Sequence, residues 1–177
     1  MATLGSTPIY DAVSRWLHWI IAVLVIGNII GGLFHDALGK MFPVMRVHKA
    51  VGITVLALTL VRIGWRFAHP LLPLPQEMPG WEKLAARLSH GLFYVLLIAV
   101  PLTGWIMVSA GDRPLNWFGL FDIPKFGVAK GDAIVGASRA GHEVLGITFA
   151  ALALLHIAAA LRHHFVLRDG ILRRMLG

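Results

Sequence analysis

The sequence contains no cysteine, and charged side chains are scarce in it. Without cysteine the chain can form no disulfide, iron–sulfur cluster, thiolate zinc site or thioether-linked c-type haem. Charged residues make up 14% of the 177 residues and hydrophobic residues 57%, whereas soluble domains have about 25% and about 45–50%. Because one small core cannot bury that much apolar surface, the composition excludes an ordinary soluble domain.

Acidic residues are the scarcer charge: nine Asp and Glu stand against 16 Lys and Arg, which gives a formal net charge of +7. A basic excess is typical of proteins that bind nucleic acid or anionic lipid. The apolar content favours membrane lipid, so we expect no nucleic-acid partner. Nine histidines remain as the only abundant metal-binding side chains.

Long runs without Asp, Glu, Lys or Arg indicate the membrane spans. Three such runs, 16–35, 88–111 and 144–161, approach or exceed the roughly 20 residues of a membrane helix. A fourth segment is strongly apolar in its middle, although Lys49 and Arg62 interrupt it. We predict an all-α membrane protein, a four-helix transmembrane bundle forming a single domain over 1–177. The predicted spans are about 15–34, 48–67, 88–110 and 142–162.

The distribution of Lys and Arg beside these spans predicts the orientation. The side with both termini carries nine of them: Arg15, Arg62, Arg66, Lys83, Arg87, Arg162, Arg168, Arg173 and Arg174. The other side carries seven: Lys40, Arg46, Lys49, Arg113, Lys125, Lys130 and Arg139. We therefore expect both termini in the cytoplasm and the second group in the periplasm.

Histidines inside a membrane are costly, so they are the first candidates for function. His18, His90 and His156 lie toward the cytoplasmic ends of their spans, and His48 and His142 lie toward the periplasmic ends. The fourteen residues between His142 and His156 place both on one helix face, about 40° apart and about 21 Å apart along the axis. One helix therefore presents an imidazole at two depths.

Each of these two histidines has a partner at its own depth. His48 can meet His142, and His18 can meet His156, each pair coming from two helices of a bundle. Two imidazoles on one iron, with no open position, are typical of electron-transfer haem, so we predict two haems b. His90 lies at the level of the second pair, where it is a candidate for a quinone or propionate contact. Four further histidines are expected at interfaces or in hydrogen bonds: His35, His69, His163 and His164.

Small and basic residues accompany the histidines. A flat macrocycle needs close approach to the backbone, which glycine permits. Four glycines follow a histidine by one turn or by fourteen residues: Gly32, Gly52, Gly104 and Gly146. Arg62 follows His48 by fourteen residues, so it shares that face at the depth of the cytoplasmic pair, where a haem propionate would neutralise it. The alternatives are tight helix packing for the glycines and snorkelling to the interface for Arg62.

Four segments surround the histidines: YDAVSRWLHWIIA, VHKAVGITVLALTLVRIGWR, SHGLFYVLLIAVPLTGW and GHEVLGITFAALALLHIAAALRHHF. Together they resemble the bacterial di-haem cytochrome b561 family and, more broadly, the cytochrome b subunits of nickel–iron hydrogenases and formate dehydrogenases. The resemblance implies a bacterial inner-membrane protein with two haems b and quinone as one redox partner. It implies that His18 and His156 hold one haem and His48 and His142 the other, and that His90 is not a usual iron ligand.

The resemblance also implies electron transfer to or from membrane quinone, which is the activity of an oxidoreductase. Similar short stand-alone chains include a superoxide oxidase, which passes electrons from periplasmic superoxide to ubiquinone. Six basic residues on the predicted periplasmic side would attract such an anion or, equally, lipid headgroups and propionates: Lys40, Arg46, Lys49, Lys125, Lys130 and Arg139. The alternative is a haem b anchor subunit that passes electrons between a periplasmic dehydrogenase or hydrogenase and the quinone pool. A transporter with a histidine proton relay is a further competitor.

Overall fold

The computed structural model describes residues 8–69 and 72–177. Within these ranges four helices are long and apolar enough to cross a membrane. They are α1 (Ala12–Leu33), α3 (Val44–Ala68), α4 (Gly80–Ser109) and α5 (Ala133–Leu161), the last continuing into the π-helical turn η1 (Arg162–Leu167). This confirms the predicted all-α architecture with four membrane helices. The organisation of 1–177 as a single domain stays a prediction, and its residues 1–7 and 70–71 lie outside the described ranges.

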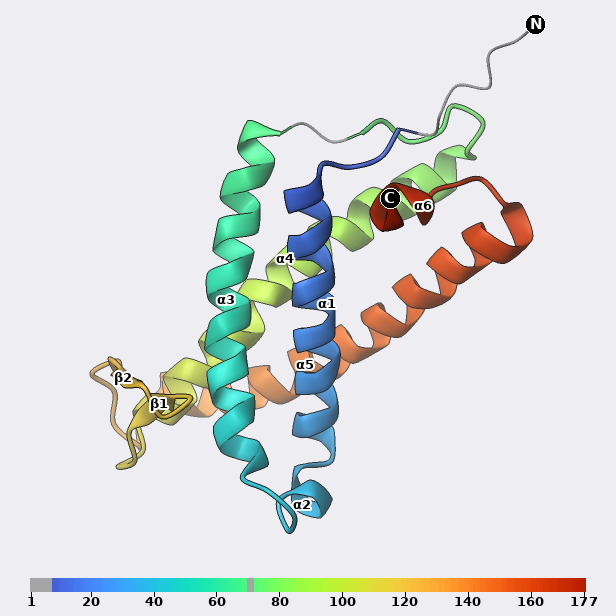
Figure 1. The fold of residues 1–177 in the computed structure, drawn as a ribbon. Coiled ribbons are helices and arrows are strands. Elements are labelled where there is room, and N and C mark those ends of the chain that lie inside the picture. Colours follow the sequence, from blue (N-terminus) through green and yellow to red (C-terminus); the bar gives the residue numbers. More distant parts are fainter. Residues whose placement is uncertain (1–7, 70–71) are drawn as a thin grey trace, which may run out of the picture.

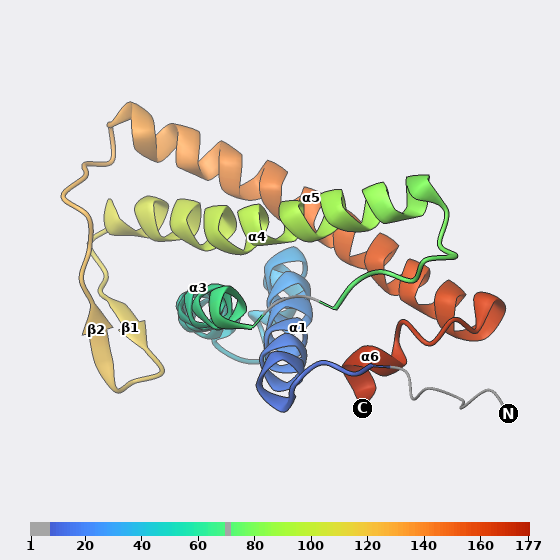
Figure 2. The same ribbon diagram turned by 90° about the horizontal axis from the view of Figure 1, so that it is seen from above.

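The four helices form two antiparallel pairs that cross each other obliquely. α1 packs along α3, α4 packs along α5, and α3 also packs against α4. Figure 1 shows α1 and α3 upright and the other two helices running obliquely behind them. Seen from above, α1 and α3 appear nearly end-on beside the length of α4 and α5 (Figure 2). This crossing lets side chains from all four helices meet in the interior.

Two helices begin well before the predicted spans. α4 begins at Gly80 rather than near 88, and α5 begins at Ala133 rather than near 142. The added turns carry charged residues such as Glu82 and Arg139, which a hydropathy criterion assigns to loops. A helix satisfies its own backbone hydrogen bonds, so it can continue past the apolar layer into water.

Both ends of the described chain meet at one end of the bundle. Asp11 caps α1 by accepting a hydrogen bond from the backbone N–H of Ser14 at 2.9 Å. The short C-terminal helix α6 (Arg173–Leu176) packs there, where the backbone N–H of Tyr10 donates to Arg174 at 3.0 Å. The indole N–H of Trp19 donates to the Met175 carbonyl at 2.9 Å. The C-terminal segment is thus fastened to the start of α1.

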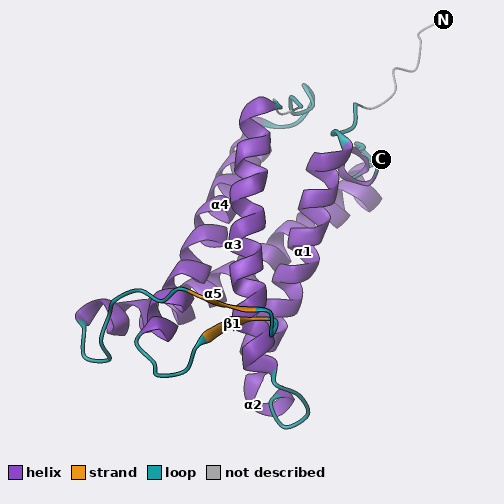
Figure 3. Ribbon diagram, turned by 60° about the vertical axis from the view of Figure 1, so that its left-hand side comes forward, coloured by secondary structure: helices purple, strands orange, loops and turns teal. Residues whose placement is uncertain are grey.

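Short elements form the opposite end of the bundle (Figure 3). The single turn α2 (His35–Leu38) joins α1 to α3, and strands β1 (Leu115–Trp117) and β2 (Phe121–Ile123) form an antiparallel hairpin between α4 and α5. The indole N–H of Trp117 donates to the hydroxyl of Thr54 on α3 at 3.0 Å. No pattern in the sequence predicts this hairpin, because strands of three residues are too short to show a periodic pattern.

The hydrophobic core lies where the helix pairs cross. It comprises the buried side chains of Ile21, Val25, Val55, Leu96, Leu97 and Phe149. Outward-facing residues are also apolar, and Val23, for example, is 68% exposed. An apolar exterior around a small core is expected when lipid rather than water covers the helices.

Candidate functional site

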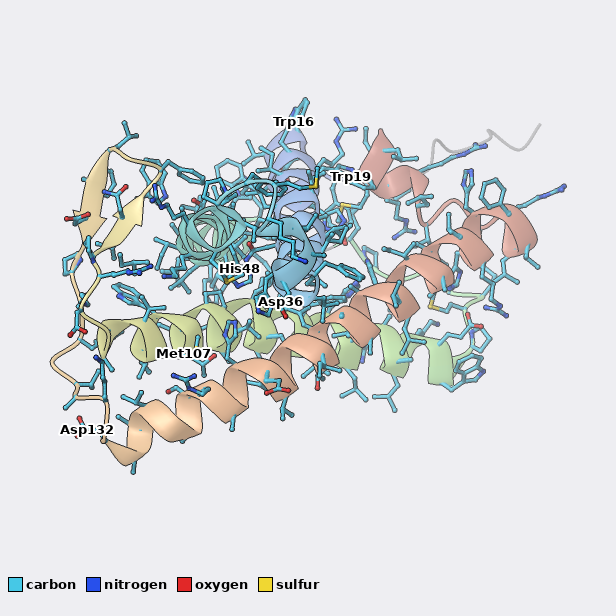
Figure 4. All side chains as sticks on the ribbon, turned by 90° about the horizontal axis from the view of Figure 1, so that it is seen from below. Trp16, Trp19, Asp36, His48, Met107 and Asp132 are labelled. Carbon is cyan, nitrogen blue, oxygen red and sulfur yellow. The ribbon has the colours of Figure 1, made fainter. Side chains whose placement is uncertain are left out.

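One pair of histidines meets at the end of the bundle that carries α2 and the hairpin. The ring centroids of His48 on α3 and His142 on α5 lie 6.0 Å apart, with the ring planes at 80°. In Figure 4 His48 lies on α3 near α1, on the side toward α4 and α5, whereas Trp16 points away from the bundle. The predicted pairing of His48 with His142 in space is therefore present in the structure.

Backbone hydrogen bonds fix the orientation of both rings. Nδ1 of His48 lies 3.1 Å from the Asn28 carbonyl of α1, and Nδ1 of His142 lies 2.9 Å from the Val100 carbonyl of α4. A carbonyl oxygen can only accept, so Nδ1 of each ring carries the proton and Nε2 keeps its lone pair. This is the arrangement that metal-ligating histidines adopt, with one nitrogen anchored and the other free to bind metal.

Two of the glycines make room for these rings. A Cβ atom on Gly32 would lie 3.0 Å from Cε1 of His48, and one on Gly104 would lie 3.0 Å from Cε1 of His142. The sequence predicts that both glycines admit a macrocycle, but the structure places an imidazole against each of them. The absent side chains therefore let α1 and α4 support the His48 and His142 rings from behind.

The other two glycines face space. A Cβ on Gly52 would meet only the Asn28 amide nitrogen, at 3.9 Å, and one on Gly146 would meet no atom of the described residues within 4 Å. Both residues follow a histidine of the pair by one helical turn. The backbone is therefore open beside the pair, as the approach of a flat cofactor requires.

A second group of imidazoles lies toward the end where the termini meet. The ring centroid of His156 on α5 is 6.4 Å from that of His18 on α1 and 5.7 Å from that of His90 on α4. The ring of Phe93 packs against His156 at 5.1 Å. His156 therefore has two imidazole neighbours rather than the single predicted one. Among residues 8–69 and 72–177, none of these three rings has a hydrogen-bond partner, in contrast to the rings of His48 and His142.

Arg62 lies at this depth, as predicted. It shares a hydrogen-bond acceptor with Arg66, which the sequence did not indicate. Nε of Arg62 donates to the hydroxyl of Tyr94 on α4 at 3.3 Å, and a guanidinium nitrogen of Arg66 donates to the same oxygen at 3.2 Å. The spacing shows only that Arg66 lies one turn after Arg62 and Tyr94 one turn after His90, so each lies on the same face as a residue already singled out.

The remaining histidines have local partners, as expected for residues at helix ends. Nδ1 of His35 is 2.9 Å from the Gly32 carbonyl, and His69 stacks on Trp65 at 4.0 Å between centroids. His163 bonds to Asp169, and His164 contacts the neighbouring Phe165 ring.

Two of the six basic residues predicted to face the periplasm are occupied within the loop between α4 and α5. Nζ of Lys130 pairs with Asp112 at 2.8 Å, and this hydrogen bond lowers the pKa of the Asp112 carboxyl below its usual value. Lys125 donates to the carbonyls of Gly111 and Arg113. The other four form neither an ion pair nor a side-chain hydrogen bond within the described ranges: Lys40, Arg46, Lys49 and Arg139.

The spacing of the imidazoles fits a shared metal. A metal–imidazole bond of about 2 Å on each side, plus the half-width of each ring, places two ring centroids about 6 Å apart. The observed separations of 6.0, 6.4 and 5.7 Å agree with this value. Paired imidazoles at two depths of an apolar helical bundle that lacks cysteine define a membrane cytochrome of the b type.

Comparison with known proteins identifies the family within this class. Residues 9–177 match the family described as prokaryotic cytochrome b561. Cytochrome b561 homolog 2 of Escherichia coli is 34% identical over 175 residues, covering 95% of this chain and 91% of the relative. Cytochrome b562 of Cereibacter sphaeroides is 33% identical and covers 96% of each chain. A probable superoxide oxidase CybB of Yersinia pestis is 30% identical, covering 94% and 95%.

The chain belongs to the prokaryotic cytochrome b561 family. It is accordingly a multi-pass bacterial membrane protein of an electron-transfer family, and its membership of a cytochrome b family implies haem b as the cofactor.

Proposed function

We propose that the protein transfers electrons between the two faces of the bacterial inner membrane, with ubiquinone or another membrane quinone as one partner. The observation that carries this proposal is the pairing of imidazoles at two depths of one bundle: His48 with His142, and His156 with His18 or His90. Two such pairs form a relay through the apolar layer, which a single site could not.

Haem b, when bound, would supply a one-electron redox centre at each depth. His48 and His142 hold the periplasmic one, their Nδ1 protons held by backbone carbonyls and their Nε2 atoms free. His156 holds the cytoplasmic one. We assign His18 as its second ligand, in agreement with the family resemblance, and leave His90 to a quinone or propionate contact. The open backbone at Gly52 and Gly146 gives the periplasmic cofactor its space.

The donor that we favour is superoxide. Four periplasmic cations have no side-chain partner in the described ranges and would attract a small anion to this face: Lys40, Arg46, Lys49 and Arg139. The Yersinia pestis relative called a probable superoxide oxidase supports the same choice. In that reaction two superoxide anions become two dioxygen molecules, while one quinone takes up two electrons and two protons.

The second candidate is a haem b anchor subunit for a periplasmic dehydrogenase or hydrogenase. The hairpin end favours it, because large apolar side chains are exposed there, including Phe118 at 51%, Leu120 at 72% and Phe121 at 53%. Such a surface suits a protein partner. For either candidate we propose that both termini lie in the cytoplasm, as the distribution of Lys and Arg beside the spans predicts.

A visible spectrum with the haem-to-protein ratio tests the relay. We expect two haems per chain, with His48→Ala or His142→Ala leaving one. A colourless protein would refute the relay and favour a transporter with a histidine proton relay.

Reduction of ubiquinone by the purified protein and a superoxide source alone tests the donor. A rate no higher than that with superoxide dismutase present would reject superoxide. Co-purification of a periplasmic redox subunit would then support the anchor function.

Alanine substitutions of His18 and His90 test the cytoplasmic ligand. We expect His18→Ala to lose the second haem and His90→Ala to keep it. The reverse result would assign His90 as the ligand.

A further inference from the structure

Two arginines of α3 converge on one tyrosine of α4. Arg62 and Arg66, one helical turn apart, donate to the Tyr94 hydroxyl at 3.3 and 3.2 Å, and the Arg66 guanidinium also lies over the Tyr94 ring, 5.1 Å from its centroid. All three side chains are partly buried. We call these three residues the arginine–tyrosine cluster.

The cluster has no counter-ion among the residues that the structure describes. In the described ranges, the carboxylates that form ion pairs do so elsewhere, and none pairs with Arg62 or Arg66. Two like charges one turn apart on a helix repel each other. Partly buried charges inside a membrane protein require an opposite charge or strong hydrogen bonds. A single phenol oxygen carries no full charge, so the arrangement calls for an anion from outside the chain.

The chemistry of the cluster indicates which anion it would take. The Tyr94 hydroxyl uses its oxygen to accept from both arginines and keeps its own proton to donate. No side chain or carbonyl of residues 8–69 and 72–177 accepts that proton. Two guanidinium groups beside one hydroxyl are donors that suit a carboxylate or a phosphate.

The cluster lies beside the imidazoles at the predicted cytoplasmic level. Tyr94 follows His90 by one turn of α4, and the adjacent Phe93 packs against His156. The charge of Arg62 is close enough to interact with the rings of His18 and His90, and that of Arg66 with the ring of His90. An anion held by the cluster would therefore be next to whatever those imidazoles bind.

We propose that Arg62, Arg66 and Tyr94 together bind a propionate carboxylate of the cytoplasmic-side haem. The inference rests on the proposed function and adds Arg66 and Tyr94 to Arg62. In this arrangement the cluster positions the cofactor and holds positive charge close to it. Positive charge disfavours the oxidised, more positive iron, so the cluster raises the reduction potential of that haem alone.

Potentiometric titration of the purified full-length protein, followed in the visible spectrum, measures both midpoints. A unit charge about 10 Å away at an effective dielectric constant near 20 changes an equilibrium constant on the order of tenfold. We therefore expect Arg66→Gln to lower one of the two midpoints by about that factor, which is about 59 mV for one electron. Tyr94→Phe should lower the same midpoint by less, and Arg66→Lys should largely preserve it.

Arg87→Gln is the matched control, since it removes one exposed charge from the same end of the protein. Midpoints for Arg66→Gln that equal those of Arg87→Gln would overturn the proposal. If Arg66→Gln instead loses bound phospholipid phosphate while both midpoints stay unchanged, the anion is a lipid headgroup and the proposal is wrong. A wild-type protein without haem would refute the proposed function itself. Two haems whose midpoints do not shift in Arg66→Gln would refute only the role of the arginine–tyrosine cluster.

Discussion

Replacing Gly104 with alanine should disturb one haem and leave the other intact. The new Cβ would lie 3.0 Å from Cε1 and 3.2 Å from Nδ1 of His142. Carbon atoms pack best at about 3.5–4.0 Å, so the imidazole must withdraw by roughly half an ångström. It cannot do so freely, because its Nδ1 donates to the Val100 carbonyl at 2.9 Å. Such overpacking costs about 1–3 kcal/mol.

That cost falls on the geometry of a ligand, so it should appear as weaker binding of the haem at the His48–His142 pair. Since 1.4 kcal/mol is a factor of ten, we expect about tenfold or greater loss of affinity for that haem. Haem release on heating and the spectrum of each haem measure it. Gly32→Ala should affect the same haem, because its Cβ would press on His48 at 3.0 Å from α1.

Gly64→Ala is the control, since a Cβ there meets no atom of the described residues within 4 Å. If Gly104→Ala releases haem no faster than Gly64→Ala and the spectra agree, the supporting role of Gly104 is refuted. Loss of both haems together would also contradict the reasoning, because the second group of imidazoles does not contact this glycine.

Three further substitutions test other parts of the structure. Gly146→Ala should weaken haem binding but leave the stability of the haem-free protein unchanged, because the new Cβ would enter open space. An unchanged haem affinity would show that Gly146 does not line the haem site. Glu82→Gln should lower the free energy of unfolding by about 1–2 kcal/mol, because Glu82 is only 9% exposed and forms an ion pair with Arg162 at 3.1 Å. Heat denaturation measures this change, and an unaltered melting temperature would contradict it. The side-chain hydrogen bond from Ser14 is the main cause of the lowered pKa of Asp11. Above about pH 4, where this carboxylate is ionised and caps α1, Asp11→Ala should lower the free energy of unfolding by about 0.5–2 kcal/mol. Because the pKa of Asp11 is lower in the folded than in the unfolded state, the stability difference between wild type and Asp11→Ala should disappear as the pH falls through the folded-state pKa. A stability difference that does not change with pH would argue against the cap.

The fold was largely predictable because hydropathy reports the environment of each segment directly. The four long helices overlap the predicted spans, and the confirmed architecture follows from apolar length alone. The early starts of α4 at Gly80 and α5 at Ala133 were missed, because charged helical turns outside the apolar layer look like loops in a hydropathy profile. The hairpin was missed because strands of three residues are too short to show a periodic pattern.

The site was predictable in its residues and less so in its contacts. The depth of each histidine follows from its place along a helix, so the meeting of His48 with His142 could be foreseen. The position of His156 between His18 and His90 could not, because it depends on how α1 and α4 are rotated about their axes.

By itself, the sequence determined the membrane environment, the number of long helices and the two depths at which imidazoles occur. These properties depend on the order of residues along each helix and on the fixed rise of the backbone. Only the tertiary structure decided that Gly32 and Gly104 face imidazole rings, and that Arg66 joins Arg62 on Tyr94. Those contacts join different helices, so they depend on which faces the packing turns toward each other, which spacing within one helix does not specify.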